Sequence, residues 1–219
     1  MKKPNNIAVL MGGQGEEREI SIKSGKAIQL ALETIGYNVL AITLENTLGD
    51  IISDLHSVDL VFLGLHGSIG ENGTIQGFLE SLGVKYTGSD PLSSAICMDK
   101  NISKIIARDS KVNTPNWEIV TRGQILNGDN SEFPLVIKPN DQGSTVGLTI
   151  VHDKSELGPA LNLAFNYSSS VMVEQFIEGR EFTVTLIEGK ALPVCEIIPS
   201  HELYDYECKY TSGMSKYVC

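Results

Sequence analysis

A loop near the middle of the chain combines the residue types that bind a polyphosphate. They are Lys138, Gly143, Ser144, Thr145 and Gly147. The lysine supplies a positive point charge, the hydroxyls add hydrogen-bond donors, and the glycines let the backbone approach a bulky anion closely. The loop is not a Walker A loop, because no Gly-Lys-Ser or Gly-Lys-Thr closes it onto a helix. The composition therefore indicates a phosphate-binding loop, with an ordinary glycine-bearing hairpin as the alternative.

Two apolar, β-branched runs must position this loop. Residues 135–137 and 148–151 have the composition of strands, and Pro139 ends regular pairing after the first of them. We therefore expect the loop to turn the chain back from one strand to the next.

The first third of the chain alternates strand and helix patterns. Strands are expected at residues 7–11, 39–44 and 59–65, and helices at residues 17–32 and 48–55. The strand runs are almost continuously apolar, as in a parallel sheet that is covered on both faces. This alternation predicts a doubly wound α/β sheet.

Two glycine-bearing loops follow strands of this predicted sheet. Gly12 and Gly13 follow the first strand, and His66 and Gly67 follow the third. Ligands of such sheets bind beyond the carboxyl ends of the strands. We therefore expect the two loops to form one site, although a lone histidine at a strand end can also have a purely structural role.

The remaining chain mixes helices and strands. Helices are expected from residue 74, over residues 91–108 and over residues 154–167, strands at residues 118–121, 171–177, 181–187 and 192–198, and a loop at residues 200–219. We expect a domain boundary near the helix at residues 91–108, because Pro115 and its neighbours end the helical pattern.

The composition excludes several kinds of protein. The chain has 219 residues, of which 42% are hydrophobic and 20% charged, a net charge of -10, and four cysteines without a Cys-x-x-Cys pair. Nucleic acids and anionic membranes require basic surfaces, so neither is an expected partner. The sequence shows no signal peptide, membrane span, zinc site or disulfide framework. It indicates a two-domain cytoplasmic protein with reduced, mostly buried thiols.

Six groups of residues, in order along the chain, resemble the D-alanine–D-alanine ligase family. They are Gly12-Gly13 with residues 17–21, residues 66–77, residues 86–89, Met98-Asp99-Lys100, residues 136–147 and residues 204–210. The resemblance covers essentially the whole chain, so it concerns both expected domains.

The resemblance implies an ATP-grasp enzyme. The implied fold is α/β, with a doubly wound parallel-sheet domain over residues 1–95 and then an incomplete α+β ATP-grasp domain. Residues 96–180 would form the small subdomain of the ATP-grasp domain, and residues 181–219 the start of the large one. The implied reaction is the ATP-dependent ligation of two D-alanines through an acylphosphate, which supplies D-alanyl-D-alanine for peptidoglycan.

The resemblance also implies a nucleotide site. Its residues would be Lys100 and Lys138 at the ATP phosphates, Ser144, Thr145 and Val146 in a mobile loop over them, Glu174 at the adenine amino group, Phe176 and Ile177 at the ring, and Glu181 at the ribose. The alternatives are solvated surface lysines and, for Glu174, a side chain that strand alternation turns to solvent.

The implied substrate site combines residues from both ends of the chain. Glu17 corresponds to the residue that binds the ammonium group of the first D-alanine, and His66 to the histidine near its carboxylate. Glu17, Ser144 and Tyr210 correspond to a hydrogen-bonded catalytic set, with Lys209 beside Tyr210 in a tyrosine-rich closing loop. The tyrosine favours D-alanine over D-lactate or D-serine as second substrate. An acid such as Glu17 at a helix N-terminus also stabilises the helix.

The end of the chain departs from the family. The implied ligands of Mg²⁺ or Mn²⁺ and a phosphate-stabilising arginine would lie beyond Cys219. We therefore expect a fragment that is nearly inactive alone, from a full-length enzyme that forms a homodimer. The alternatives are a non-catalytic module that binds nucleotide or D-alanine, and another ATP-grasp carboxylate–amine ligase.

Overall fold

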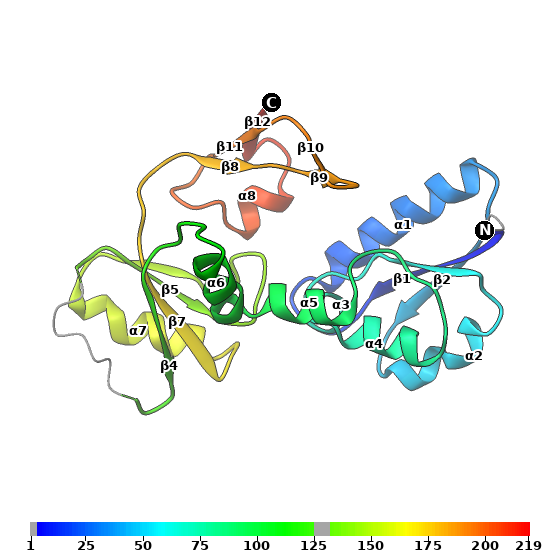
Figure 1. The fold of residues 1–219 in the computed structure, drawn as a ribbon, viewed down its shortest axis with the longest axis horizontal. Coiled ribbons are helices and arrows are strands. Elements are labelled where there is room, and N and C mark those ends of the chain that lie inside the picture. The colour runs from blue at the N-terminus through cyan, green and yellow to red at the C-terminus, as the bar shows by residue number, and fades with distance from the viewer. Residues whose placement is uncertain (1–3, 125–131) are drawn as a thin grey trace. The chain divides into compact units, whose positions relative to one another are not determined.

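The chain forms two compact units, each with its own sheet and core (Figure 1). The computed structural model describes residues 4–124 and 132–219. The N-terminal unit comprises Met1–Ser103 and the C-terminal unit Lys104–Cys219. The division into three parts at residues 95 and 180 stays a prediction. No helix in the described ranges is long and apolar enough to cross a membrane.

A three-stranded parallel sheet forms the centre of the N-terminal unit. Its strands are β1 (Asn6–Gly12), β2 (Asn38–Leu44) and β3 (Leu60–Leu63), in the order β2-β1-β3. Its helices are α1 (Arg18–Thr34), η1 (Leu48–Ile51), α2 (Ile52–Leu55), α3 (Ser68–Glu71), α4 (Thr74–Ser81) and α5 (Pro91–Met98). β1 is buried from Ile7 to Gly12, as expected for the central strand of a parallel sheet. The predicted doubly wound sheet is confirmed.

The prediction of one helix over residues 91–108 is wrong. α5 ends at Met98, and α6 (Lys100–Asp109) begins after Asp99, whose φ of -79° and ψ of 103° are extended. The Asp99 carboxylate accepts a hydrogen bond from the Ile102 amide at 2.9 Å, and so it caps the start of α6. A break of one residue hardly disturbs the apolar spacing that predicted a single helix.

A four-stranded antiparallel sheet and one covering helix form the core of the C-terminal unit. The strands are β4 (Trp117–Thr121), β5 (Leu135–Pro139), β6 (Thr149–Val151) and β7 (Ser170–Gln175), in the order β4-β7-β5-β6. α7 (Lys154–Ala164) places Ala160 and Ala164 in one buried cluster with Ile137, Val171 and Val173 of the sheet. The antiparallel pairing of β5 with β6 confirms the predicted return of the chain after the loop.

A second group of strands completes the C-terminal unit. It contains β8 (Glu181–Thr183), β9 (Leu186–Ile187), β10 (Lys190–Ala191), β11 (Cys195–Pro199), α8 (Tyr206–Tyr210) and β12 (Ser215–Val218). The strand predicted over residues 181–187 is therefore interrupted, and the loop predicted over residues 200–219 is wrong. Asp205 caps α8, and β12 pairs with β11. Such pairing depends on a distant segment and cannot be inferred from the local sequence.

The cysteines are more exposed than predicted. All four lie in the described ranges and are free thiols. Cys97 and Cys219 are exposed, Cys195 is half-buried and Cys208 is buried, so the expectation of mostly buried thiols is wrong. The short helix α5 turns Cys97 away from the core, and this orientation outweighs the general tendency of thiols to be buried.

Candidate functional site

Three charged side chains form a largely buried group in the C-terminal unit. We call Lys104, Lys138 and Glu174 the Glu174 cluster. Lys104 Nζ donates a hydrogen bond to Glu174 Oε1, and Lys138 Nζ donates one to Glu174 Oε2. The three side chains are 12%, 19% and 9% exposed, in that order. The alternative in which Glu174 points to solvent is therefore wrong, and Lys138 is not a solvated surface lysine.

Strand register brings this cluster together. In the antiparallel pair of β5 and β7, Val136 lies opposite Glu174 and Lys138 opposite Met172. Because strand side chains alternate, Lys138 and Glu174 point to the same face of the sheet, opposite the face that packs on α7. Trp117 of β4 lies opposite Glu174 and shares this face. α6 contributes Lys104 to it.

The Glu174 cluster has an excess of positive charge. Two ammonium groups and one carboxylate leave a net charge of +1 (2 − 1) in a site that is largely shielded from water. A buried charge is costly unless it is paired, so the cluster favours a further anion next to it. The loop with the hydroxyls and glycines follows Lys138 directly in the chain and is suited to hold the same anion.

Two further side chains hold Lys104 in place. Its ammonium group donates a hydrogen bond to Thr114 Oγ1 and lies 4.7 Å from the centroid of the Trp117 ring. Arg108, one turn further along α6, lies over the same ring at 4.2 Å. These contacts were not predicted from the sequence. The available signal was the four-residue spacing of Lys100, Lys104 and Arg108, which places three cations on one face of a helix.

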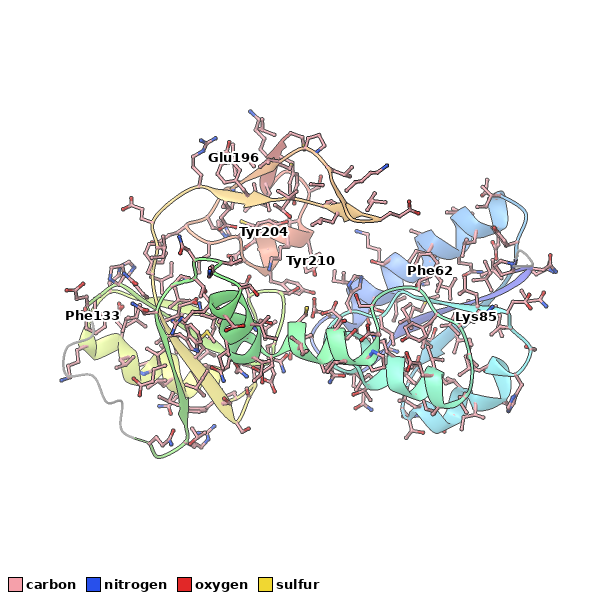
Figure 2. The ribbon with its side chains drawn as sticks, in the orientation of Figure 1. Phe62, Lys85, Phe133, Glu196, Tyr204 and Tyr210 are labelled. Atoms are coloured by element: carbon pink, nitrogen blue, oxygen red, sulfur yellow. The ribbon has the colours of Figure 1, made fainter. Side chains whose placement is uncertain are left out.

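The loop after β5 is fastened to the segment that contains α8. Ser144 Oγ lies 3.0 Å from the Tyr210 hydroxyl, and Thr145 Oγ1 accepts a hydrogen bond from Lys209 Nζ at 2.9 Å. The Thr145 hydroxyl also donates to the Tyr204 carbonyl oxygen at 2.9 Å. Figure 2 shows Tyr204 and Tyr210 on this segment. The structure thus brings four predicted site residues together, and their roles stay predictions.

The backbone of this loop is unusual. Ser144 and Thr145 have φ values of 47° and 64°, in the left-handed region that side chains other than glycine rarely adopt. The half-buried Val146, the third predicted residue of the loop, donates its amide to the Gly143 carbonyl oxygen at 3.0 Å and closes the turn. The loop therefore has a strained backbone conformation, which its hydrogen bonds hold in place.

The residues predicted for adenosine lie at and after the end of β7. The Phe176 amide donates to the Pro134 carbonyl oxygen at 3.2 Å, and the exposed Ile177 lines a cavity of about 410 Å³. The other residues that line it are Asn113, Thr114, Pro115, Asn116 and Gln175. Thr114 also binds Lys104, so this cavity adjoins the Glu174 cluster. Glu181 is exposed at the first residue of β8 and does not line it.

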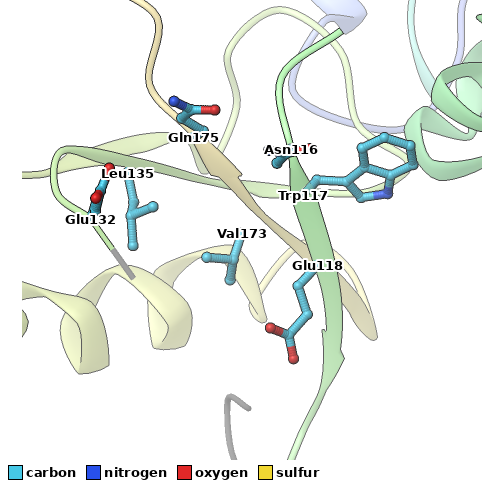
Figure 3. A pocket seen from close by; sticks show the side chains of 7 residues that line it. All are labelled: Asn116, Trp117, Glu118, Glu132, Leu135, Val173 and Gln175. Carbon is cyan, nitrogen blue, oxygen red and sulfur yellow. The ribbon is translucent and has the colours of Figure 1, made fainter. Parts of the chain in front are cut away.

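A second cavity, of about 370 Å³, lies on the other side of the sheet (Figure 3). It is lined by Asn116, Trp117, Glu118, Glu132, Leu135, Val173 and Gln175. In Figure 3 the side chains of Glu118 and Val173 point toward α7, whereas the Trp117 ring points away from them. The three residues of the Glu174 cluster do not line this cavity, so it is separate from the cluster.

In the N-terminal unit, the two predicted loops meet at one edge of the sheet. Glu17 precedes α1 and is 8% exposed, and a Cβ atom added to Gly67 would lie 2.3 Å from its Oε2 atom. His66 Nε2 lies 3.1 Å from Ser24 Oγ, and His66 Nδ1 lies 3.9 Å from Glu71 Oε1. The two loops therefore lie at one edge of the sheet, while the expectation that they form one site and the roles of Glu17 and His66 stay predictions.

Lys100 also lies in the N-terminal unit. It is the first residue of α6 and is half-buried. Its predicted role at the ATP phosphates stays a prediction.

One group of described side chains has the composition of a metal site. His201, Asp205 and Cys208 place their potential ligand atoms within 4.8 Å of one another. The Cys208 amide and the His201 ring, at 2.9 and 2.8 Å, lower the pKa of Asp205 to about 2, and the Asp205 carboxylate raises the pKa of His201. Mg²⁺ prefers oxygen ligands, so an imidazole and a thiol do not fit it. These contacts are those of a helix cap at α8.

Comparison with known proteins identifies the family. Residues 43–89 match the family described as D-ala D-ala ligase N-terminus, and residues 106–219 match the family described as D-ala D-ala ligase C-terminus. The chain is 48% identical over 213 residues to a D-alanine–D-alanine ligase of Aquifex aeolicus, which covers 96% of this chain and 72% of that protein. It is 44% identical over 207 residues to one from Bacillus anthracis, covering 93% of this chain and 68% of that protein.

Solved structures agree with these relatives. A crystal structure of D-alanine–D-alanine ligase from Bacillus anthracis has a TM-score of 0.85 at 43% identity, over 97% of this chain and 71% of that chain. The same enzyme complexed with ATP has a TM-score of 0.83 at 40% identity, over 97% and 69%. A D-Ala:D-Ser ligase from Enterococcus faecalis has a TM-score of 0.75 at 30% identity, over 98% and 76%. The chain belongs to the D-alanine–D-alanine ligase family.

Proposed function

We propose that this protein ligates two D-alanines to D-alanyl-D-alanine with ATP, in the cytoplasm, for peptidoglycan synthesis. The Glu174 cluster carries the proposal, because its excess positive charge lies directly before a loop of hydroxyls and glycines. The names of the relatives support the substrate, and the ATP complex of one of them supports the nucleotide.

The ATP phosphates would bind at Lys138, with Lys100 as the second cation. A compact ammonium group is suited to a polyanion, and Lys138 is partly desolvated, which strengthens its attraction for phosphate. The hydroxyls of Ser144 and Thr145 and the backbone around Val146 would cover the phosphates. Water would then be excluded from the reactive intermediate.

The adenosine would bind beside the cavity that Ile177 and Thr114 line. The Glu174 carboxylate accepts hydrogen bonds and so suits the adenine amino group. Phe176 and Ile177 offer apolar surface to the ring, and Glu181 would accept from the ribose hydroxyls. All four residues belong to the segment from β7 to β8, so one stretch of chain would bind the whole nucleoside.

The first chemical step forms an acylphosphate. A carboxylate oxygen of the first D-alanine attacks the γ-phosphorus of ATP, the bond from that phosphorus to the β–γ bridging oxygen breaks, and ADP leaves. Negative charge develops on the transferring oxygens, and the nearby lysine ammonium groups stabilise it. The neutral amine of the second D-alanine then attacks the acyl carbon, the bond to the phosphate oxygen breaks, and the nitrogen loses a proton.

The first D-alanine would bind at the two glycine loops of the N-terminal unit. The buried Glu17 carboxylate suits the ammonium group of the first D-alanine, and His66 suits its carboxylate. Ser144, Lys209 and Tyr210 would close over both substrates. A D-Ala:D-Ser ligase is among the structural relatives. D-alanine and D-serine are therefore both compared as the second substrate.

Magnesium is the cofactor that family membership implies besides ATP. In the described part of the chain, the grouped ligand set His201, Asp205 and Cys208 does not fit Mg²⁺, so the steps above involve only side chains and substrates. We also propose that the full-length enzyme is a homodimer, on the basis of the family resemblance alone.

ADP release by the purified protein, as its gene encodes it, tests the proposed function. We expect release that depends on D-alanine, weaker release with D-serine or D-lactate as second substrate, and D-alanyl-D-alanine as product. Release with other amino acids but not D-alanine would identify another carboxylate–amine ligase. Nucleotide binding without turnover under any of these conditions would identify a non-catalytic module.

A further inference from the structure

Lys104 is held by three partners. Its ammonium group donates to Glu174 and to Thr114, and it lies 4.7 Å from the centroid of the Trp117 ring. Only 12% of its side chain is exposed. A lysine has three rotatable donors on a flexible stem, so three surrounding partners are needed to fix it. Lys104 is therefore a fixed cation.

Lys138 is held less firmly. Within the described residues its one polar contact is with Glu174, and its side chain is more exposed, at 19%. The two cations also bind different oxygens of the same carboxylate, Oε1 for Lys104 and Oε2 for Lys138. Lys138 can therefore turn toward an anion while Lys104 keeps its hold on Glu174.

We propose that Lys104 is a positioning residue of the nucleotide site, which keeps the Glu174 carboxylate in place as an acceptor when Lys138 turns to phosphate. The inference rests on the proposed function, because it takes Glu174 to meet the purine. When Lys138 leaves, Oε2 is freed to accept a hydrogen bond from the exocyclic amino group, and Lys104 remains as the cation that offsets the buried negative charge.

This arrangement makes a prediction about the purine. A carboxylate fixed by Lys104 accepts from the 6-amino group of ATP and repels the 6-oxo group of inosine triphosphate, which has an acceptor at the same position. Without Lys104, the carboxylate loses the contact that orients it, so it can turn its oxygens away from the oxo group and repel it less. Lys104 would therefore contribute to the preference for adenine.

The test compares Lys104→Met with Arg108→Met. Arg108 is a matched control because it lies on the same helix and over the same Trp117 ring, and its contacts in the described structure do not include Glu174. Binding is followed by fluorescence of Trp117, the single tryptophan of the chain, and so does not depend on turnover. KM and kcat with ATP and inosine triphosphate are measured in parallel.

For Lys104→Met we expect the Kd and KM for ATP to rise about tenfold or more, as for other residues that orient a ligand-binding group. The preference for ATP over inosine triphosphate should fall by a similar factor, while kcat at saturating ATP changes less. Lys104→Arg should recover much of the preference, since it keeps the charge. Arg108→Met should change both ratios less than about twofold, as for a surface change away from the ligand.

An unchanged preference in Lys104→Met overturns the inference, because a purely structural role would weaken both nucleotides equally. If Lys104→Met does not fold, Thr114→Val decides, since it removes the other acceptor of Lys104 and keeps the shape of the side chain. A preference that is also unchanged in Thr114→Val contradicts the role. If the wild-type protein binds neither ATP nor inosine triphosphate, the proposed function itself is wrong. This outcome differs from an unchanged preference in the variants, which overturns only the role of Lys104.

Discussion

The Glu174 cluster and the contact between the 144–145 loop and the α8 segment are built in different ways. The cluster is formed by charged side chains on two neighbouring strands and on α6, and it is largely buried. The loop contact includes a hydrogen bond between the Ser144 and Tyr210 hydroxyls and one from Lys209 to Thr145, between segments more than 60 residues apart. Strand pairing sets the first, and side-chain conformations set the second.

This difference fits the two proposed tasks, which are binding of the nucleotide by the cluster and closure over the substrates by the loop. A site that must recognise the same base in every cycle benefits from a fixed sheet, because reorganisation would weaken its electrostatics. A loop that must admit and release substrates benefits from few, exchangeable hydrogen bonds. Mutations in the cluster should therefore lower stability and nucleotide affinity, and mutations in the loop should change the kinetics with D-alanine.

The largest effect is expected from Glu174→Gln. The change leaves two mostly buried ammonium groups without their carboxylate, and breaking a buried pair costs about 3–5 kcal/mol in the free energy of unfolding. Urea denaturation followed by Trp117 fluorescence measures it. Glu196→Gln is the control, because Glu196 pairs at 2.6 Å with Arg180, whose side chain is 70% exposed. Equal losses in both variants would contradict the contrast between buried and surface pairs.

The second effect concerns Gly67→Ala. A Cβ atom there would lie 2.3 Å from Glu17 Oε2, so the carboxylate must move. Displacements of about 1 Å at a substrate site can cost roughly 100-fold in rate, and we expect the KM for D-alanine to rise at least about tenfold while the KM for ATP stays unchanged.

Gly83→Ala is the matched control for Gly67→Ala. Gly83 has a similar φ of 70°, but no atom lies within 4 Å of the added Cβ. The control should share the backbone strain, about 1–2 kcal/mol, without the effect on D-alanine. A KM for D-alanine that rises equally in both variants would show that Glu17 does not bind this substrate.

A smaller effect is expected from Tyr210→Phe. It removes the hydrogen bond to Ser144, worth about 1 kcal/mol, or roughly fivefold in kcat/KM for D-alanine. Tyr217→Phe is the control, since it removes a hydroxyl contact with Tyr204 at 2.7 Å and leaves the contact between Ser144 and Tyr210 in place. Identical kinetics with D-alanine and with D-lactate in the wild type and in Tyr210→Phe would remove Tyr210 from the closing set.

The smallest effect concerns pH and the α8 cap. The pKa of His201 is raised by Asp205, so its contribution to stability is full below the ordinary value near 6.5 and is lost as pH rises through the folded pKa. The pKa of Asp205 is lowered to about 2, so its contribution is present above about 4 and is lost as pH falls toward 2.

Titration of the His201 ring by NMR checks this prediction. We expect a pKa above 6.5 in the wild type and a return toward the ordinary value in Asp205→Asn. The same titration in both proteins would mean that the contact at 2.8 Å does not persist in solution.

Patterns that depend on local chain chemistry were predictable from the sequence. The continuous apolar run at residues 7–11 predicted the central strand β1, and Pro139 with the following glycines predicted the turn between β5 and β6. Features that depend on distant partners were not. The strand β12 exists because β11 offers an edge, and the sequence of residues 200–219 contains no sign of that edge.

The candidate site shows the same limit. The motif residues Lys138 and Glu174 were predicted through the resemblance, but their contact depends on the register of β5 and β7. Lys104 was not predicted, because its contact depends on Glu174 of the distant strand β7. A local signal, the spacing of the cations on α6, was present, but it predicts only a helix face and not the carboxylate that meets it.

The sequence distance within the Glu174 cluster has a consequence for synthesis of the protein. Lys104 and Glu174 are 70 residues apart in the chain. At a translation rate of about 5–20 residues per second, roughly 4–14 s separate the synthesis of the helix residue from that of its partner. During this interval the cations of α6 repel one another without a carboxylate between them. The ribosome therefore completes the helix long before it supplies the strand that stabilises it, and the site matures late in translation.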